Sequence, residues 1–382
     1  MICSFRLSAP IITLTLLIGA ACSSANRAAD KVTVDFEMAE VAIDWLEHLK
    51  TGGSDDVLRA HFFEHVAPTE GCQVIVRHWA RFMEWDEEIF YNFILEALGK
   101  KETDKPLQNE DGTPTALGHS RALWINALQN TEKLRENFQA LRKADLEKAS
   151  IKLAKRYLPK GADVTNTFHI VLFGGSPAFS VGDANGYDLL QLPVLEDGTL
   201  NLERILLTFA HEMHHSGFAN ASALHMSDVE NEENISLVGI LAAEGMATWL
   251  INRPLDHLEE YRTGTDPIYS LVAQDWDRLL PQIPELYKNA ETDIRLNLIG
   301  ELEQQELQQR WMSGYQGAAY ILGCDMIATI EEHLGLKATR SIANDYRQLL
   351  NIYNRAAMRA NKHGADKFVF NEALAVDIAS HR

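Results

Sequence analysis

Apolar and polar positions alternate with helical spacing over the first part of the chain. Phe36, Ile43 and Leu46 recur three to seven positions apart, which places them on one face of a helix. The run Thr131–Tyr157 mixes lysine, arginine and glutamate at close spacing, and it predicts one long solvated helix. We therefore predict a helical N-terminal region over residues 32–160.

The pattern changes after residue 160, where two short runs are typical of strands. Residues 167–173 (TFHIVLF) are rich in β-branched and aromatic side chains, and residues 187–192, which end at Pro193, are the second predicted strand. A helical pattern returns near Thr199 or Asn201, either of which could cap the helix, and continues to the C-terminus. This order predicts an α+β protein that is predominantly helical, with one domain over residues 161–382.

The N-terminus has the features of an export signal. Residues 1–22 carry one basic side chain, then an apolar run too short to span a bilayer, then small residues that end at Cys22. This segment resembles a bacterial lipoprotein signal, which would make Cys22 the lipidated first residue; ordinary signal cleavage nearby is the alternative. Residues 23–31 would then form a tether. We expect an exported protein of the cell envelope, held to the membrane by a lipid anchor.

Composition narrows the class of protein. The 382 residues are 46% hydrophobic and 23% charged, as in ordinary globular proteins, and the net charge is −19. Such a negative balance argues against a nucleic-acid partner, which requires a basic surface. No two cysteines form a CxxC pair, so a zinc site built from cysteine thiolates is not expected. Cys72 and Cys324 are expected to be free or buried, although their pairing stays open.

The segment His211-Glu212-Met213-His214-His215 carries the most specific chemistry in the chain. His211 and His215 are four residues apart, so on a helix their imidazoles project to one side and can bind one metal ion. Glu212 lies between them in sequence and can reach a water bound to that ion. This is the HExxH pattern of zinc hydrolases. His214 is out of phase with both and is expected to point away from the metal.

A catalytic zinc ion needs a third protein ligand and one open position. Glu244 is the best candidate, because it is the one carboxylate within the apolar run from Ile235 to Ile251 and is costly to bury without a partner or a metal. Gly245 would let a facing helix approach closely. The rival acids lie in a polar connector and are expected to be solvated: Asp228, Glu230, Glu232 and Glu233.

An HExxH helix followed by a helix with the run Ala242–Ala247 (AAEGMA) resembles the gluzincin class of zinc peptidases. The segment Tyr320–Met326 (YILGCDM) is similar to a helix in a poorly characterised bacterial group of zinc-dependent peptidases. The likeness covers roughly residues 165–340 and is specific at these three motifs. It implies a zincin-like domain holding one zinc ion and acting on a peptide or protein substrate.

The resemblance also implies roles for further residues. Glu212 would act as general base, and a tyrosine or histidine would stabilise the oxyanion. Tyr320 is the first choice for that donor, with Tyr315 second and His225 third. Zincin resemblance further implies an edge strand that pairs with an extended substrate, and we assign it to Tyr187, Asp188, Leu189 and Leu190. Two alternatives remain open: a hydrolase of non-peptide substrates, and an envelope protein that binds zinc without catalysis.

Overall fold

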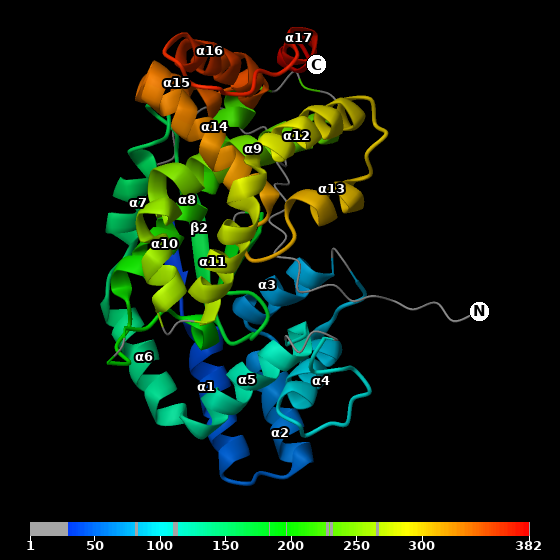
Figure 1. Cartoon of the computed structure of the whole chain (residues 1–382). Coiled ribbons are helices and arrows are strands. Elements are labelled where there is room, and N and C mark those ends of the chain that lie inside the picture. The colour runs from blue at the N-terminus through cyan, green and yellow to red at the C-terminus, as the bar shows by residue number, and fades with distance from the viewer. Residues whose placement is uncertain are drawn as a thin grey trace, which may run out of the picture. The chain divides into compact units, whose positions relative to one another are not determined.

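The structure is a computed structural model that describes residues 30–80, 83–109, 114–182, 184–195, 197–226, 229, 232–264 and 267–381 (Figure 1). The predicted signal with Cys22 and most of the predicted tether lie outside the described residues, as do the rival acids Asp228 and Glu230. The last tether residue, Lys31, instead begins the first strand.

The fold is α+β and predominantly helical, as predicted, with one small sheet. The chain divides into two compact units. Unit 1 contains Val32–Glu147 and Asn166–Ile205, and unit 2 contains Lys148–Thr165 and Leu206–Arg382. The strand segment after residue 165 therefore groups with the first helices, whereas the sequence grouped it with the C-terminal helices.

The sheet of unit 1 has four strands in the order β1-β2-β4-β3. β4 runs parallel to β2, with Ile170 opposite Tyr187, and antiparallel to β3, with Phe179 opposite Gly186. A short 3-10 helix, Leu189–Gln191, follows β4 directly. The strands are β1 (Lys31–Asp35), β2 (Thr165–Val171), β3 (Ala178–Val181) and β4 (Ala184–Asp188).

The predicted substrate edge strand is wrong. Tyr187 and Asp188 end β4, which is hydrogen-bonded on both sides, and Leu189 and Leu190 lie in the 3-10 helix after it. An inner strand has no free backbone groups for a peptide to pair with. The cause is β3, a four-residue strand hidden in the glycine-bearing loop, which returns as a hairpin and covers that side of β4.

The helices of unit 1 follow the predicted apolar spacing, with one difference. The expected single helix over residues 131–157 is two helices, because the chain turns at Asp145, whose φ of 45° is left-handed. Within unit 1 lie α1 (Glu37–Lys50), α2 (Asp55–His61), the π-helix η1 (Phe62–Val66), α3 (Glu70–Trp79), α4 (Glu87–Ala97), α5 (Ala116–Gln129) and α6 (Thr131–Lys143).

Unit 2 is built around α9 and α14, which pack along each other (Figure 1). The stretch Glu232–Asn252 is long and apolar enough to cross a membrane, yet 83% of its most apolar window is buried inside the chain, as expected of a core helix. The α-helices and the π-helix of unit 2 are α7 (Glu147–Lys155), α8 (Leu202–His225), α9 (Ser236–Ala247), the π-helix η4 (Thr248–Asn252), α10 (Pro254–Thr263), α11 (Pro267–Leu279), α12 (Ile283–Leu298), α13 (Gln304–Trp311), α14 (Ala318–Leu334), α15 (Leu336–Ile342), α16 (Leu349–Lys362) and α17 (Glu372–Ala379).

Two glycines allow α9 and α14 to touch backbone to backbone. A Cβ atom on Gly245 would lie 2.5 Å from the carbonyl carbon and oxygen of Gly323. A Cβ on Gly323 would in turn lie 2.5 Å from the carbonyl oxygen of Leu241. Neither contact can be relieved by rotating a side chain, so the crossing requires glycine on both helices. The predicted role of Gly245 as a point of close approach is thus visible in the fold.

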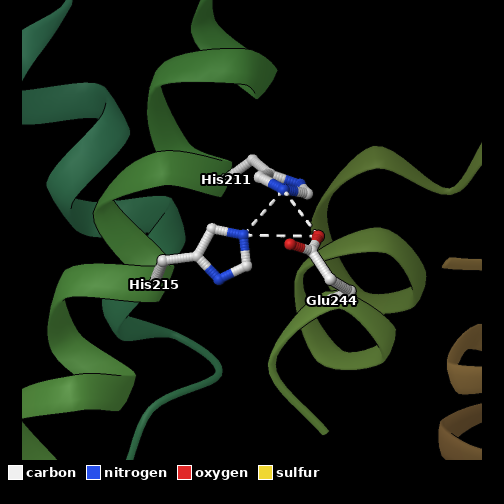
Figure 2. A group of neighbouring side chains, drawn as sticks. All are labelled: His211, His215 and Glu244. Atoms are coloured by element: carbon white, nitrogen blue, oxygen red, sulfur yellow. Dashed lines mark hydrogen bonds and ion pairs between the residues drawn. The ribbon is translucent and has the colours of Figure 1, made fainter. Parts of the chain in front are cut away.

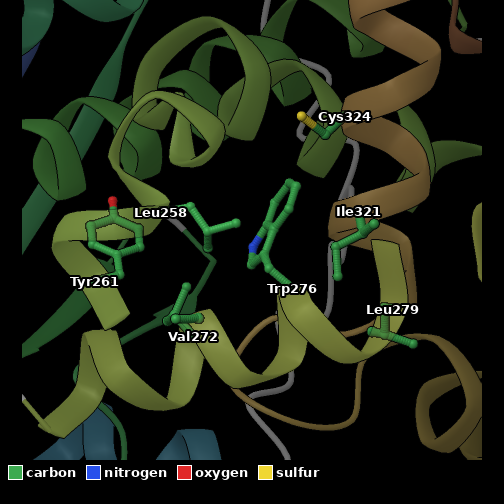
Figure 3. Close-up of a cluster of buried hydrophobic side chains, with 8 residues drawn as sticks. Leu258, Tyr261, Val272, Trp276, Leu279, Ile321 and Cys324 are labelled. Carbon is green, nitrogen blue, oxygen red and sulfur yellow. The ribbon is translucent and has the colours of Figure 1, made fainter. Parts of the chain in front are cut away.

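An apolar cluster fixes the other side of α14 (Figure 3). Trp276 of α11 is 1% exposed and packs against Ile321 and Cys324 of α14. The cluster is completed by Leu258 and Tyr261 of α10 and by Val272, Ala273 and Leu279 of α11. Burial of apolar surface stabilises a fold by about 25 cal/mol per Å². The cluster therefore holds α14 against α10 and α11.

Candidate metal centre

The α8 helix places both histidines of the HExxH segment on the same side. Asn201 caps the helix, since its Oδ1 accepts a hydrogen bond from the backbone N–H of Arg204 at 3.1 Å. One turn separates His211 from His215, and their imidazole centroids lie 4.6 Å apart. Glu212 lies next to His211 and is only 8% exposed. Of the two predicted caps, Thr199 and Asn201, Asn201 is the one that caps the helix, and the two histidines face the same side as predicted.

Glu244 of α9 completes a group with these two histidines (Figure 2). Its Oε2 lies 3.5 Å from Nε2 of His211 and 3.5 Å from Nε2 of His215. The two Nε2 atoms are 2.9 Å apart. Among the residues that the structure describes, this is the group of three or more histidine, cysteine or acidic side chains whose ligand atoms all lie within 4.8 Å of one another.

These distances fit a metal ion of the size of zinc. Nitrogen and oxygen ligands lie about 2.0–2.2 Å from zinc, so two ligands at a tetrahedral angle are about 3.4 Å apart. The two 3.5 Å separations match this value, and the 2.9 Å separation requires a small opening. Both oxygens of Glu244 are buried without a hydrogen-bond partner in the described structure. A buried carboxylate of this kind is costly unless it binds a cation.

The carboxylate and the imidazoles of the centre shift one another's pKa values towards the charged forms. Burial by itself would raise the pKa of Glu244, but the neighbouring imidazoles of His215 and His211 outweigh it and lower that pKa to about 2. For His211, burial opposes charging, yet Glu244 and Glu212 raise its pKa above the ordinary value. The carboxylate is therefore ionised and available as an anionic ligand throughout the physiological pH range.

Tyr320 of α14 lies beside this group. It is 7% exposed, and burial together with the charges of Glu244 and Glu212 raises its pKa well above the ordinary value of tyrosine. The Gly245–Gly323 crossing explains its place, because Tyr320 lies one turn before Gly323 on α14. A tyrosine with a raised pKa keeps its proton at neutral pH and can donate a hydrogen bond.

The other two oxyanion candidates have different surroundings. Tyr315 packs against the apolar cluster of Figure 3, and burial and the charge of Asp275 raise its pKa to about 12. His225 is the exposed last residue of α8, about 15 Å along the helix axis from His215 at 1.5 Å per residue. His225 is thus too distant to act on a group bound at the centre.

His214 and the described rival acids lie outside the group formed by His211, His215 and Glu244. His214 is fully buried and is not in the facing group, and neither of its ring nitrogens has a hydrogen-bond partner in the described structure. Of the described rival acids, Glu232 accepts a hydrogen bond from the hydroxyl of Tyr346 at 2.6 Å, and Glu233 is likewise absent from the group. Neither of these two acids competes with Glu244 as a ligand.

The sequence did not predict that Asn252 contacts the centre. The side chain of Asn252 meets His211, with 3.1 Å between Oδ1 and Nδ1. Asn252 ends the π-helix η4, eight residues after Glu244. A helix of ordinary pitch would not bring both residues to one face, and no pattern in the sequence signals the π-helix.

Comparison with known proteins gives one match. The family described as "putative zinc dependent peptidase" (DUF5700) matches residues 64–362, which covers most of the chain and includes His211, His215 and Glu244 as well as Glu212 and Tyr320. No curated protein and no solved structure matches the chain.

Proposed function

The chain belongs to this family of zinc-dependent peptidases, and on that premise we propose that it hydrolyses peptide bonds at the centre formed by His211, His215 and Glu244. The family supports the cofactor, zinc, and a peptide or protein substrate. The observation that carries the proposal is the buried carboxylate of Glu244, 3.5 Å from two imidazoles and without a hydrogen bond.

Each residue of the centre has a role in the proposed mechanism. His211, His215 and Glu244 would hold zinc, which when bound would supply Lewis acidity and lower the pKa of a coordinated water towards about 7. Glu212 would act as general base, taking a proton from the attacking water and delivering it to the leaving amine. Tyr320, kept protonated by its raised pKa, donates a hydrogen bond to the carbonyl oxygen as negative charge develops there. Two histidines and a glutamate are the ligand set expected of a gluzincin.

Replacing Glu212 tests the reaction. Glu212→Gln should keep zinc, because Glu212 is not in the ligand group, and should lower turnover of peptide substrates about 100- to 10,000-fold. Glu203→Gln, an exposed acid in the first turn of the same helix, is the matched control and should retain full activity. Glu212→Gln protein that cleaves peptides as fast as wild type would refute the mechanism.

We also propose that the protein is exported and lipidated at Cys22. The support is the short apolar run and the small residues before Cys22. Cells fed a labelled fatty acid should incorporate it into the wild-type protein and not into Cys22→Ala. Equal labelling of both would exclude this anchor.

A further inference from the structure

The two imidazoles of the centre differ in how their second nitrogen is held. Nδ1 of His211 lies 3.1 Å from Oδ1 of Asn252. Nδ1 of His215 is buried and has no hydrogen-bond partner in the described structure. His211 is therefore the imidazole whose orientation a neighbouring side chain controls.

The contact also decides which nitrogen of His211 carries the proton. The Oδ1 atom of Asn252 can only accept, so Nδ1 of His211 must be the donor. A neutral imidazole with its proton on Nδ1 has a lone pair on Nε2, the atom that faces Glu244 and His215. The side chain of Asn252 thus favours the tautomer that binds a metal.

The π-helix η4 explains how Asn252 reaches this place. In an uninterrupted α-helix, eight residues turn the chain by about 800°, which would leave Asn252 about 80° from the direction of Glu244. The residues Thr248–Asn252 instead form π turns, closed by a 2.8 Å bond from the N–H of Arg253 to the carbonyl of Thr248. Each residue of these wider turns advances roughly 20° less, so five residues return Asn252 to the face of Glu244.

We propose that Asn252 is a positioning residue for the metal centre, which orients His211 and fixes its metal-binding tautomer from the same helical segment that supplies Glu244. The inference rests on the proposed zinc site. A neutral amide suits this role, because it aligns the imidazole without adding a third negative charge beside Glu244 and Glu212. Partners of this kind contribute about 10- to 100-fold to metal affinity.

Zinc affinity of the full chain, measured by competition with a chromogenic chelator, tests the proposal without reference to turnover. Asn252→Ala should bind zinc 10- to 100-fold more weakly than wild type. Asn252→Asp retains an acceptor oxygen and should restore most of the affinity. In the zinc-free protein, ¹⁵N spectra should show the His211 proton on Nδ1 in wild type and a mixture of tautomers in Asn252→Ala.

Asn354→Ala is the matched control. This buried amide of α16 makes two hydrogen bonds to the backbone of Phe370, at 2.8 and 2.9 Å, so its loss lowers stability without touching the centre. It should bind zinc as wild type does. Folded Asn252→Ala that binds zinc within threefold of wild type would overturn the proposal. Wild-type protein that binds zinc but cleaves no peptide would contradict the proposed function and leave the role of Asn252 intact.

Discussion

Two buried carboxylates, one in each unit, show opposite ways of keeping a charge inside a protein. Asp188 of unit 1 and Glu244 of unit 2 are both 0% exposed. Asp188 accepts four hydrogen bonds, from the backbone N–H groups of Phe173, Gly174 and Leu190 and from the side chain of Gln191. Glu244 accepts none in the described structure.

The difference separates a structural carboxylate from one arranged for a ligand. The donors to Asp188 all come from the turn after β2 and the 3-10 helix after β4, so this carboxylate ties two loops together. Glu244 faces the two imidazoles at distances longer than the roughly 2.8 Å of a charge-assisted hydrogen bond. Burial alone therefore does not identify a ligand; in Glu244 it coincides with two facing imidazoles and with the lack of a hydrogen-bond donor in the described structure.

Removing Glu244 should have the largest effect on metal content. Glu244→Ala deletes one of three ligands, so zinc affinity should fall by more than the 10- to 100-fold that a supporting residue contributes. Zinc per protein after dialysis, read by atomic absorption, measures it. Full occupancy in the variant would assign the third ligand to another acid.

Removing Asp188 should lower stability and leave metal content unchanged. Asp188→Ala leaves several buried N–H groups without an acceptor, and we expect the free energy of unfolding to fall by about 3–5 kcal/mol. Urea denaturation measures this loss, and zinc bound per folded molecule should stay at the wild-type value. A variant of unchanged stability that loses zinc would show that the contrast between the two carboxylates is false.

The pH dependence of stability sharpens the same contrast. Burial raises the pKa of Asp188 from 3.8 to about 6, although its four hydrogen bonds oppose the shift. A raised carboxyl pKa means that the folded state holds its proton more tightly, so ionisation of Asp188 lowers stability as pH rises from about 4 to 6. As pH rises across that range, wild type should lose about 3 kcal/mol of unfolding free energy relative to Asp188→Asn. A difference independent of pH would mean that the hydrogen bonds cancel the cost of burial.

The smallest expected effect tests how Glu244 is held. Gly245→Ala places a Cβ within 2.5 Å of Gly323, so α9 and α14 must separate, at about 1–3 kcal/mol. Peptidase activity should fall as Tyr320 moves from Glu244. Gly239→Ala on the same helix, where the new Cβ would meet the Tyr346 ring at 3.3 Å, is the milder control. Equal losses in both variants would remove the special role of the crossing.

Sequence reasoning found the parts of the centre that depend on local spacing. The four-residue interval between His211 and His215 predicted their facing, and the isolation of Glu244 in an apolar helix predicted its partnership with them. Both inferences need only the period of a helix and the cost of a buried charge.

The parts that were missed depend on contacts between distant segments or on irregular backbone. The short strand β3 changes β4 from an edge to an inner strand, and four residues carry too weak a pattern to predict it. Asn252 needed the π-helix to reach His211, and Asp145 broke an otherwise continuous helical pattern. Such departures from regular geometry leave no periodic signal.

The two cysteines of the described chain have a practical consequence. Cys72 and Cys324 are buried and unpaired, and burial raises the pKa of both thiols, that of Cys72 to about 12. Disulfide exchange requires an accessible thiolate, and these side chains offer almost none at neutral pH. The folded units should consequently have the same covalent structure in an oxidising and a reducing compartment. Recombinant protein made in a reducing cytoplasm is therefore suitable for measuring zinc affinity, stability and peptide hydrolysis, whatever the compartment of the native protein.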